Sequence, residues 1–168
     1  MLFRSDVNEV RFSSRAPAWK CIHQPPLLAL RGRFAVVDGA LANETGTIES
    51  GSWAEQGYPH YVGTGAYTWT FEAPEEAGRV FLETPEAAVV ASVTLNGQRL
   101  ATRLWAPYRF ELTQALQPGL NTLTLEITST SVNLLGWNDP WKLIHWQFPN
   151  GRTEGQPAGL IAPARLLW

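Results

Sequence analysis

The sequence predicts an all-β fold, built as an antiparallel β-sandwich. Apolar and polar residues alternate along several short stretches, with the period of two that is typical of a strand with one solvent-facing side. Turn residues separate these stretches, and few residues follow a sustained helical period. About six to nine short strands divided in this way favour two packed antiparallel sheets, while the pattern leaves the strand order open.

A lead-in, a first predicted strand and a long loop precede the clearly alternating strands. Residues 1–26 are a mostly irregular lead-in, because they end on a Pro-Pro pair that neither a central strand nor a helix would accept. The sandwich domain is therefore expected over residues 27–168. Its first strand is predicted in LLALRGRFAVV, residues 27–37, and the loop-rich stretch DGALANETGTIESGS follows at 38–52.

The clearest alternation lies in AYTWTFEAP, residues 66–74. Tyr67, Trp69 and Phe71 alternate with polar residues there, so this strand is expected to place Trp69 in the core. GRVFLET and VVASVTLNG predict two more strands after it. The Asn-Gly pair at 96–97 supplies the two positive-φ positions of a type I′ hairpin, so the strands on either side of it are expected to be antiparallel neighbours.

Further strands are predicted beyond that hairpin. PYRFELT is a short strand, QALQPGLN is a one-turn helix or a turn, and NTLTLEIT alternates again. GLIAPARLLW predicts a closing edge strand, which tolerates Pro163. The residues expected to face inward from the two central strands are Val89, Ala91, Val93, Leu95, Leu123, Leu125 and Ile127.

Composition and charge exclude several classes of function. The 168 residues suffice for one domain with a real core, 45% are hydrophobic, and no apolar run approaches the roughly 18 residues of a membrane span. A formal net charge of −2 with scattered signs predicts no nucleic-acid partner. Cys21 is the only cysteine, so neither an intrachain disulfide nor a cysteine-rich zinc site is expected.

The opening residues, MLFRSDVNEVRF, lack the apolar core and the small-residue cleavage site of a secretory signal. Nothing in them directs export. The chain is therefore expected to be either cytoplasmic or a piece of a longer protein, itself exported or cytoplasmic, and the sequence leaves its localisation open.

Acidic residues give no sign of a hydrolytic site. Such a site needs two carboxylates that face each other across a cleft, roughly 5 to 10 Å apart. Glu75-Glu76 and the pair Glu83 and Glu86 lie at predicted turns, where solvated loop charges are the favoured interpretation. We therefore expect the domain itself to be non-catalytic.

No cofactor is expected, and a metal site is left open. The three histidines lack the spacing of a zinc site, and the sequence contains neither a nucleophile elbow nor a phosphate-binding loop. Sandwich domains often hold a structural calcium ion, which needs six or more oxygen ligands. Asp38, Glu83 and Glu126 could contribute, although no spacing singles them out.

The central block contains several motifs in a fixed order. They are Tyr67 in a strand after a Gly-rich loop, Val93 before Asn96-Gly97, Pro107-Tyr108 with Glu111 and Thr113, Gly119 with Asn121, and the closing AGLIAPARLL. In this set and order the chain resembles the sugar-binding jelly-roll domain attached to family 2 glycoside hydrolases and to bacterial α-L-rhamnosidases. The resemblance covers residues 28–168, with Ala158 and Ala162 where Ser and Gly are usual. Most of these residues are expected to set turns or fill the core.

This resemblance implies a galactose-binding-like jelly roll. It also implies a non-catalytic accessory domain that forms the C-terminal part of a larger bacterial glycoside hydrolase. The partners that follow are a saccharide or an adjacent catalytic domain. Fold alone does not determine function, so the site has to be argued from its residues.

Sugar recognition joins flat aromatic faces to hydrogen-bonding side chains in a concave site. The stretches SWAEQGYPHY and NLLGWNDPWKLIHW have this composition, and loops gather at the ends of a jelly roll. The candidate ligand-binding residues are Trp53, Tyr58, His60, Tyr61, Trp105, Asn133, Trp137, Asn138, Asp139 and Trp141.

The same tryptophans allow another interpretation, since tryptophan is usually buried. A Trp-rich loop can cover a sandwich edge or dock on a neighbouring domain. The alternative function is therefore a protein-interaction or scaffold module of the same fold without sugar affinity. A stand-alone hydrolase is disfavoured, because no convincing carboxylate pair is present.

Overall fold

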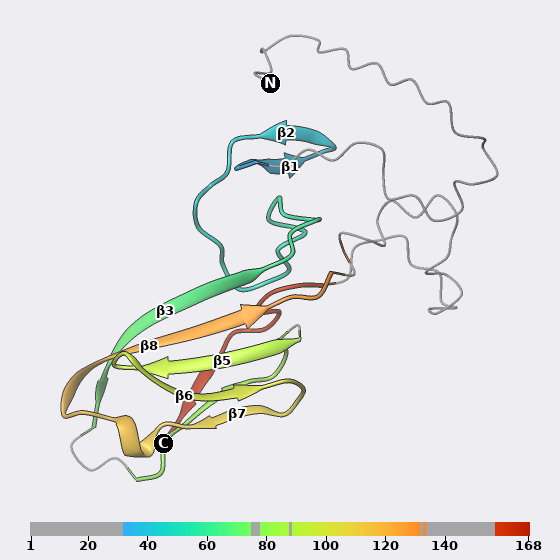
Figure 1. Cartoon of the computed structure of the whole chain (residues 1–168). Helices are drawn as coiled ribbons and strands as arrows, with labels where there is room; N and C mark the ends of the chain where they lie inside the picture. Colours follow the sequence, from blue (N-terminus) through green and yellow to red (C-terminus); the bar gives the residue numbers. More distant parts are fainter. Residues whose placement is uncertain (1–31, 75–77, 88, 132, 134–156) are drawn as a thin grey trace, which may run out of the picture. The chain divides into compact units, whose positions relative to one another are not determined.

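The computed structural model describes residues 32–74, 78–87, 89–131, 133 and 157–168. The predicted domain boundary and the start of the first predicted strand lie outside these residues. The described residues form nine strands, and every strand pair is antiparallel (Figure 1). The strands are β1 (Ala35–Val37), β2 (Ala40–Ala42), β3 (Thr64–Ala73), β4 (Phe81–Thr84), β5 (Val90–Leu95), β6 (Gln98–Arg103), β7 (Tyr108–Glu111), β8 (Gly119–Thr128) and β9 (Arg165–Leu167).

Two of the sheets form the sandwich. One has four strands in the order β3-β8-β5-β6, and the other has three in the order β7-β4-β9, while β1 and β2 form a separate hairpin. Leu82 and Phe110 of the smaller sheet and Val93 and Leu125 of the larger one share a single buried core. The predicted fold class, an all-β antiparallel sandwich, is confirmed.

The alternation predicted for the central strands is confirmed with one exception. Val89 is 37% exposed and lies just before β5 with a φ of 149°, so its backbone has turned out of the extended conformation that would give it the predicted face. The inward residues Ala91, Val93, Leu95, Leu123, Leu125 and Ile127 are fully or almost fully buried.

The prediction that Trp69 belongs to the core is wrong. It lies on the inner face of β3, opposite Leu123, yet its side chain is 37% exposed. The period of two identifies the face of a strand but not the layer that covers it. Because β3 is the outer strand of its sheet, Trp69 lies at the margin of the sandwich.

The β1–β2 hairpin corrects another prediction, because β2 lies inside the stretch predicted to be loop. Asp38 and Gly39 have φ values of 50° and 77°, close to the 51° and 79° of Asn96 and Gly97. Both pairs thus supply the two positive-φ positions of a type I′ turn. The Asp-Gly pair in the sequence therefore predicts this hairpin in the same way as Asn-Gly.

The remaining predicted elements are confirmed. The predicted one-turn helix is a 3-10 turn, η2 (Thr113–Ala115), which follows β7. The closing strand β9 pairs with β4 alone and begins after Pro163, so the proline removes no hydrogen bond from the ladder.

A buried amide network joins the β5–β6 turn to the start of β8, at what we term the hairpin end (the 96–97 turn and residues 112–118). The Asn121 side chain is fully buried, and its Nδ2 donates to the carbonyls of Gln117 and Gly119 at 2.8 Å each. Asn96 donates to Asn121 Oδ1 at 2.8 Å and accepts from the backbone N–H of Thr122 at 2.9 Å. These motif residues therefore have the structural roles expected of them.

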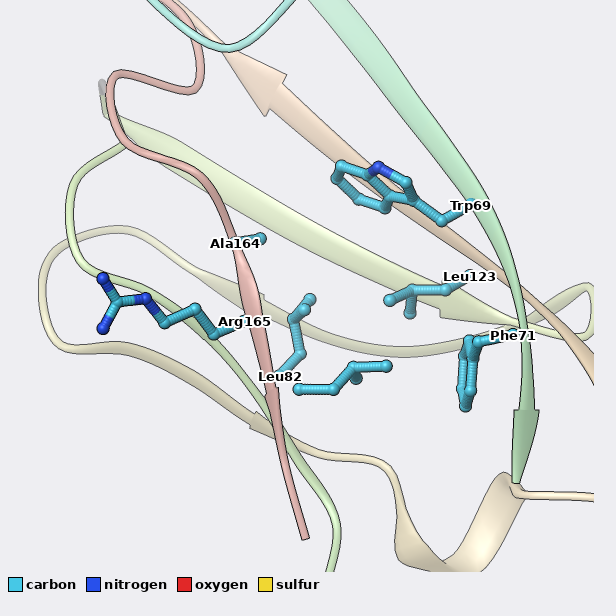
Figure 2. Close-up of a pocket in the computed structure, with 7 residues that line it drawn as sticks. Trp69, Phe71, Leu82, Leu123, Ala164 and Arg165 are labelled. Carbon is cyan, nitrogen blue, oxygen red and sulfur yellow. The ribbon is translucent and has the colours of Figure 1, made fainter. Parts of the chain in front are cut away.

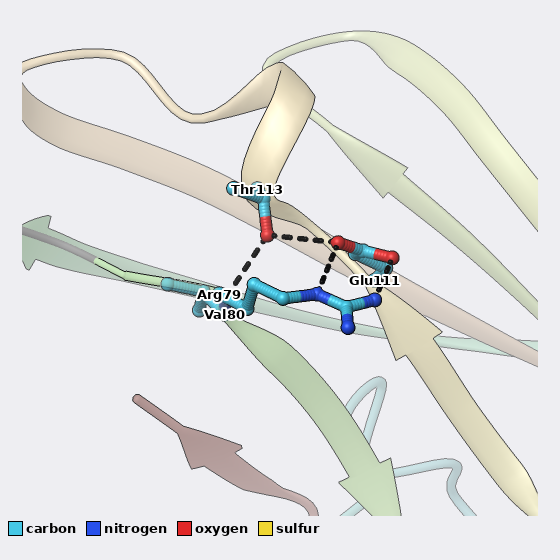
Figure 3. A network of polar contacts seen from close by, with 4 residues as sticks. All are labelled: Arg79, Val80, Glu111 and Thr113. Carbon is cyan, nitrogen blue, oxygen red and sulfur yellow. Dashed lines mark hydrogen bonds and ion pairs between the residues drawn. The ribbon is translucent and has the colours of Figure 1, made fainter.

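An ion pair closes the same end of the sandwich (Figure 3). Arg79 donates two hydrogen bonds to Glu111, at 3.1 and 2.9 Å. Thr113 donates to the same carboxylate at 3.3 Å and accepts from the backbone N–H of Val80 at 3.0 Å. The hydrogen bond from Arg79 holds the pKa of Glu111 below its ordinary value.

Candidate functional site

Several connections meet at the opposite end of the sandwich, which we term the loop end. Thr64, the first residue of β3, pairs with Thr128, the last residue of β8. Arg103, the last residue of β6, pairs with Ala91 near the start of β5, so the β6–β7 connection lies at this end as well. The loop end comprises residues 43–63, 104–107 and 129–131.

Trp53 anchors the β2–β3 connection in the core. Its side chain is 1% exposed, and its indole Nε1 donates a 2.7 Å hydrogen bond to the hydroxyl of Tyr67. Its backbone N–H donates to the carbonyl of Ala158 at 2.8 Å. A Cβ atom on Gly159 would lie 2.5 Å from the indole nitrogen, so only glycine fits against the ring. In this conformation Trp53 supports the loop end from within.

Tyr61 is the solvent-facing member of an aromatic cluster that also contains Trp53 and Tyr58. Tyr61 is 42% exposed, and its ring makes T-shaped contacts with Trp53, with the centroids 5.5 Å apart, and with Tyr58 at 6.5 Å. The Tyr61 hydroxyl donates to the carbonyl of Thr64 at 3.1 Å. Three predicted site residues are therefore brought together, with one ring available to solvent.

His60 and Asn133 come together although they are far apart in the sequence. His60 Nδ1 lies 3.5 Å from the carbonyl oxygen of Asn133, whose side chain is buried. Nearby, the backbone N–H of Ser129 donates to the carbonyl of Gly63 at 3.0 Å. The loop that carries the aromatic cluster is thus fastened to the chain after β8.

Trp105 is the most exposed of the described candidate residues. It is 72% exposed, and its neighbour Leu104 is 56% exposed, on the β6–β7 connection. The Tyr108 hydroxyl donates to the carbonyl of Val89 at 2.7 Å, which joins this connection to the one before β5. Burial raises the pKa of the Tyr108 phenol. Trp105 shares the loop end with the aromatic cluster, but none of the described ring contacts links the two.

The rest of the predicted site lies outside the described residues, so its role stays a prediction. This part consists of Trp137, Asn138, Asp139 and Trp141.

The described residues show no ready metal site and no helix of membrane-spanning character. In this part of the chain, no group of three or more His, Cys, Asp or Glu residues could hold a metal ion. Asp38 lies in the β1–β2 turn, Glu126 in β8, and Glu83 in β4 rather than at the turn where it was predicted. No described helix is both long and apolar enough to cross a membrane.

A hollow that sequence reasoning missed opens between β3 and β9 (Figure 2). This apolar notch has a volume of about 240 Å³. The sequence did not indicate the notch, because Trp69 was predicted to be a core residue. Its lining consists of Trp69, Phe71, Leu82, Leu123, Ala164, Arg165 and Leu166.

Known proteins that resemble this chain are large glycoside hydrolases. A candidate beta-glucuronidase from Formosa agariphila is 29% identical over 126 residues, which are 69% of this chain and 11% of that protein. A rhamnosidase from Novosphingobium sp. PP1Y has a solved structure that matches with 29% identity and a TM-score of 0.51, over 66% of this chain and 11% of that one. No model of a protein family matches the sequence.

A further solved structure agrees in fold. The FMN-binding beta-glucuronidase from Facaelibacterium prausnitzii L2-6 matches with a TM-score of 0.50 and 23% identity, over 80% of this chain and 20% of that one. The chain thus spans 11% of the curated relative and no more than a fifth of these two solved chains. The similar segment is a small part of large glycoside hydrolases.

Proposed function

We propose that this chain is a non-catalytic accessory domain of a larger glycoside hydrolase, with a galactose-binding-like jelly roll that binds a saccharide at its loop end. Binding would be weak, through stacking on an aromatic face and hydrogen bonds to hydroxyls. The adjacent catalytic domain would be its partner within the longer enzyme.

The observation that carries this proposal is the solvent-facing ring of Tyr61 beside polar groups. Trp53 and Tyr58 make T-shaped contacts with it, so a sugar stacking on it would meet a ring that is already held in place. His60 lies in the same loop end, next to the carbonyl of Asn133, so polar groups lie in the connection that carries the ring. Support also comes from the similarity to segments of enzymes that act on glycosides.

A saccharide titration followed by NMR tests this proposal. L-rhamnose, D-glucuronate and their oligosaccharides are the first ligands to try, since a rhamnosidase and beta-glucuronidases are among the similar proteins. We expect the shifts to concentrate at residues 58–63. Tyr61→Ala should weaken binding by about three- to tenfold, the value of a lost aromatic contact, while Tyr61→Phe should retain it.

The proposal fails if no saccharide moves any loop-end resonance at high millimolar concentration while both variants remain folded. A shift that is the same for Tyr61→Ala and the unmodified chain would place the binding elsewhere and would also contradict it. Trp168→Ala is the matched control, because Trp168 is an exposed tryptophan that packs against Phe71 of β3, away from residues 58–63.

A second candidate function is an interaction module without sugar affinity. The neighbouring exposed side chains of Leu104 and Trp105 favour it, because adjacent exposed apolar residues are typical of protein-binding surfaces. A photo-crosslinking residue at position 105 of the full-length protein tests this function. We expect it to form crosslinks to a neighbouring domain. If residue 105 forms no crosslink to any other protein segment, this function is contradicted.

A further inference from the structure

The outer edge of β3 has no paired strand among the described residues, although β3 is ten residues long and pairs with β8 along its whole length. Natural edge strands are normally protected by shortness, lysine, proline or a bulge. The β3 sequence TGAYTWTFEA contains no lysine, arginine or proline, and its pairing with β8 runs without a register shift.

The apolar notch beside this edge is suited to a protein side chain. Its 240 Å³ fall below the roughly 300 Å³ or more of a typical ligand pocket. Apart from the Trp69 indole N–H and Arg165, the lining side chains are apolar, and Arg165 extends away from Trp69 (Figure 2). A sugar in the notch would leave most of its hydroxyls without partners, which is costly.

The β3 edge is complementary to a second copy of itself. An antiparallel pairing with Trp69 on the two-fold axis keeps the inner and outer faces of the two strands matched. On the inner face, aromatic residues of the two copies then lie opposite one another. On the outer face, threonines of the two copies lie opposite one another. The pairs are Trp69 with Trp69, Tyr67 with Phe71, Thr68 with Thr70, and Ala66 with Glu72 of the second copy.

Neither charge nor hydroxyl placement opposes this register. Glu72 is the only charged residue of β3, and the register sets it opposite an alanine rather than another acid. Threonine pairs already bond across β3 and β8, with Thr64 and Thr128 hydroxyls 2.8 Å apart. Cross-strand aromatic and threonine pairs each stabilise a sheet.

We propose that the outer edge of β3 is a homodimerisation surface, in which two copies pair antiparallel about Trp69 and the Trp69 ring of each copy closes the notch of the other. The four-stranded sheets would then join into one continuous sheet across the two-fold axis.

Sedimentation of the full chain from micromolar to millimolar concentration tests the proposal. We expect a reversible monomer–dimer equilibrium. Trp69→Ala should raise the dissociation constant by about tenfold or more, the effect of removing an interface hot spot. Leu41→Ala is the control, because Leu41 is a more exposed apolar residue that lies on the separate β1–β2 hairpin, and it should leave the dimer intact.

Charge changes at exposed positions test the register without disturbing the core. Ala66→Glu places a carboxylate opposite Glu72 of the second copy, and also opposite Glu126 of its own β8, and should weaken the dimer, more so at low salt. Adding Glu72→Lys to that variant restores an opposite-charge pair and should recover dimerisation. A merely sticky surface would not show this rescue.

Three outcomes would overturn the proposal. One is a chain that stays monomeric at millimolar concentration. Another is a dimer whose dissociation constant is unchanged by Trp69→Ala. The third is protection of the outward-facing β3 amides from hydrogen exchange in the dilute monomer, since another segment of the chain would then already cover this edge.

Discussion

The two ends of the sandwich are built from different chemistry. At the hairpin end, Asn96 and Asn121 turn their side chains onto backbone groups, and Glu111 is held by Arg79. At the loop end, aromatic rings pack on one another and one of them, Tyr61, faces solvent. Polar side chains therefore serve the fold at one end, while the other end offers surface that the fold does not require.

The difference between the two ends shows that the family resemblance identifies the fold rather than a binding site. The motifs that link the chain to glycoside hydrolases include Asn96, Glu111, Thr113 and Asn121, and each of them now has a structural partner. They identify the sandwich and contribute nothing visible to a site. A function has to be argued from the loop end, where side-chain choice is less constrained by the fold.

Trp53→Ala is expected to have the largest effect and would show that the loop end rests on a buried support. Loss of this ring leaves a cavity and removes one of the hydrogen bonds to the Tyr67 hydroxyl, so the free energy of unfolding should fall by about 3 to 5 kcal/mol. Urea denaturation measures it. Trp105→Ala, the exposed counterpart, should cost less than about 0.5 kcal/mol. Equal losses would break the distinction between the two tryptophans.

Asn121→Ala tests the hairpin end. The substitution removes two donated and two accepted hydrogen bonds from a fully buried position, so the free energy of unfolding should fall by about 3 kcal/mol. Thermal or urea unfolding gives the value. Thr122→Ala, one residue along and exposed, is the control and should change stability little. A small loss for Asn121→Ala would mean that water replaces these bonds.

Much of the fold could be predicted because it depends on local pattern. Alternation placed Leu123 and Leu125 in the core, and Asn96-Gly97 located its hairpin. The Asp38-Gly39 hairpin carried the same signal and was missed, because its flanking strands are too short to alternate visibly. Period-two reasoning failed for Trp69, since coverage by a facing sheet depends on how many strands that sheet has.

The candidate site was less predictable because its contacts join distant parts of the sequence. Composition identified Tyr58, His60 and Tyr61, but the contact of His60 with Asn133 spans two connections. No local signal indicated that Trp53 would point inward onto Tyr67 while Tyr61 stayed exposed. Such choices follow from long-range packing.

Tyr67→Phe tests the buried support of the loop end, because it removes the hydroxyl oxygen to which Trp53 donates. The Tyr67 hydroxyl accepts from the Trp53 indole and from the backbone N–H of Leu160, at 2.7 and 3.2 Å. Both donors would be left unsatisfied in a buried site, so stability should fall by about 2 kcal/mol. Tyr58→Phe is the control, because the Tyr58 hydroxyl has only a 3.5 Å contact with Thr45. A neutral Tyr67→Phe in urea denaturation would disprove the support role.

The smallest expected effect concerns pH at the hairpin end. The pKa of Glu111 is lowered by the hydrogen bond from Arg79, so folding favours the ionised carboxylate. Its contribution is therefore fully present above the pKa of the unfolded chain, roughly 4.3, and is lost as the pH falls through the lower folded value. Because both side chains are solvent-exposed, the contribution should be small and screened by salt.

Thermal unfolding of the unmodified chain and of Glu111→Gln, compared from neutral to acidic pH, measures this contribution. We expect Glu111→Gln to melt slightly lower near neutrality and the two melting curves to converge as the carboxylate is protonated. A difference that stays constant with pH would show that Glu111 acts through hydrogen bonds that its amide replacement cannot make, rather than through charge. The hairpin end would then be held by neutral polar contacts alone, and its difference from the loop end would be one of geometry.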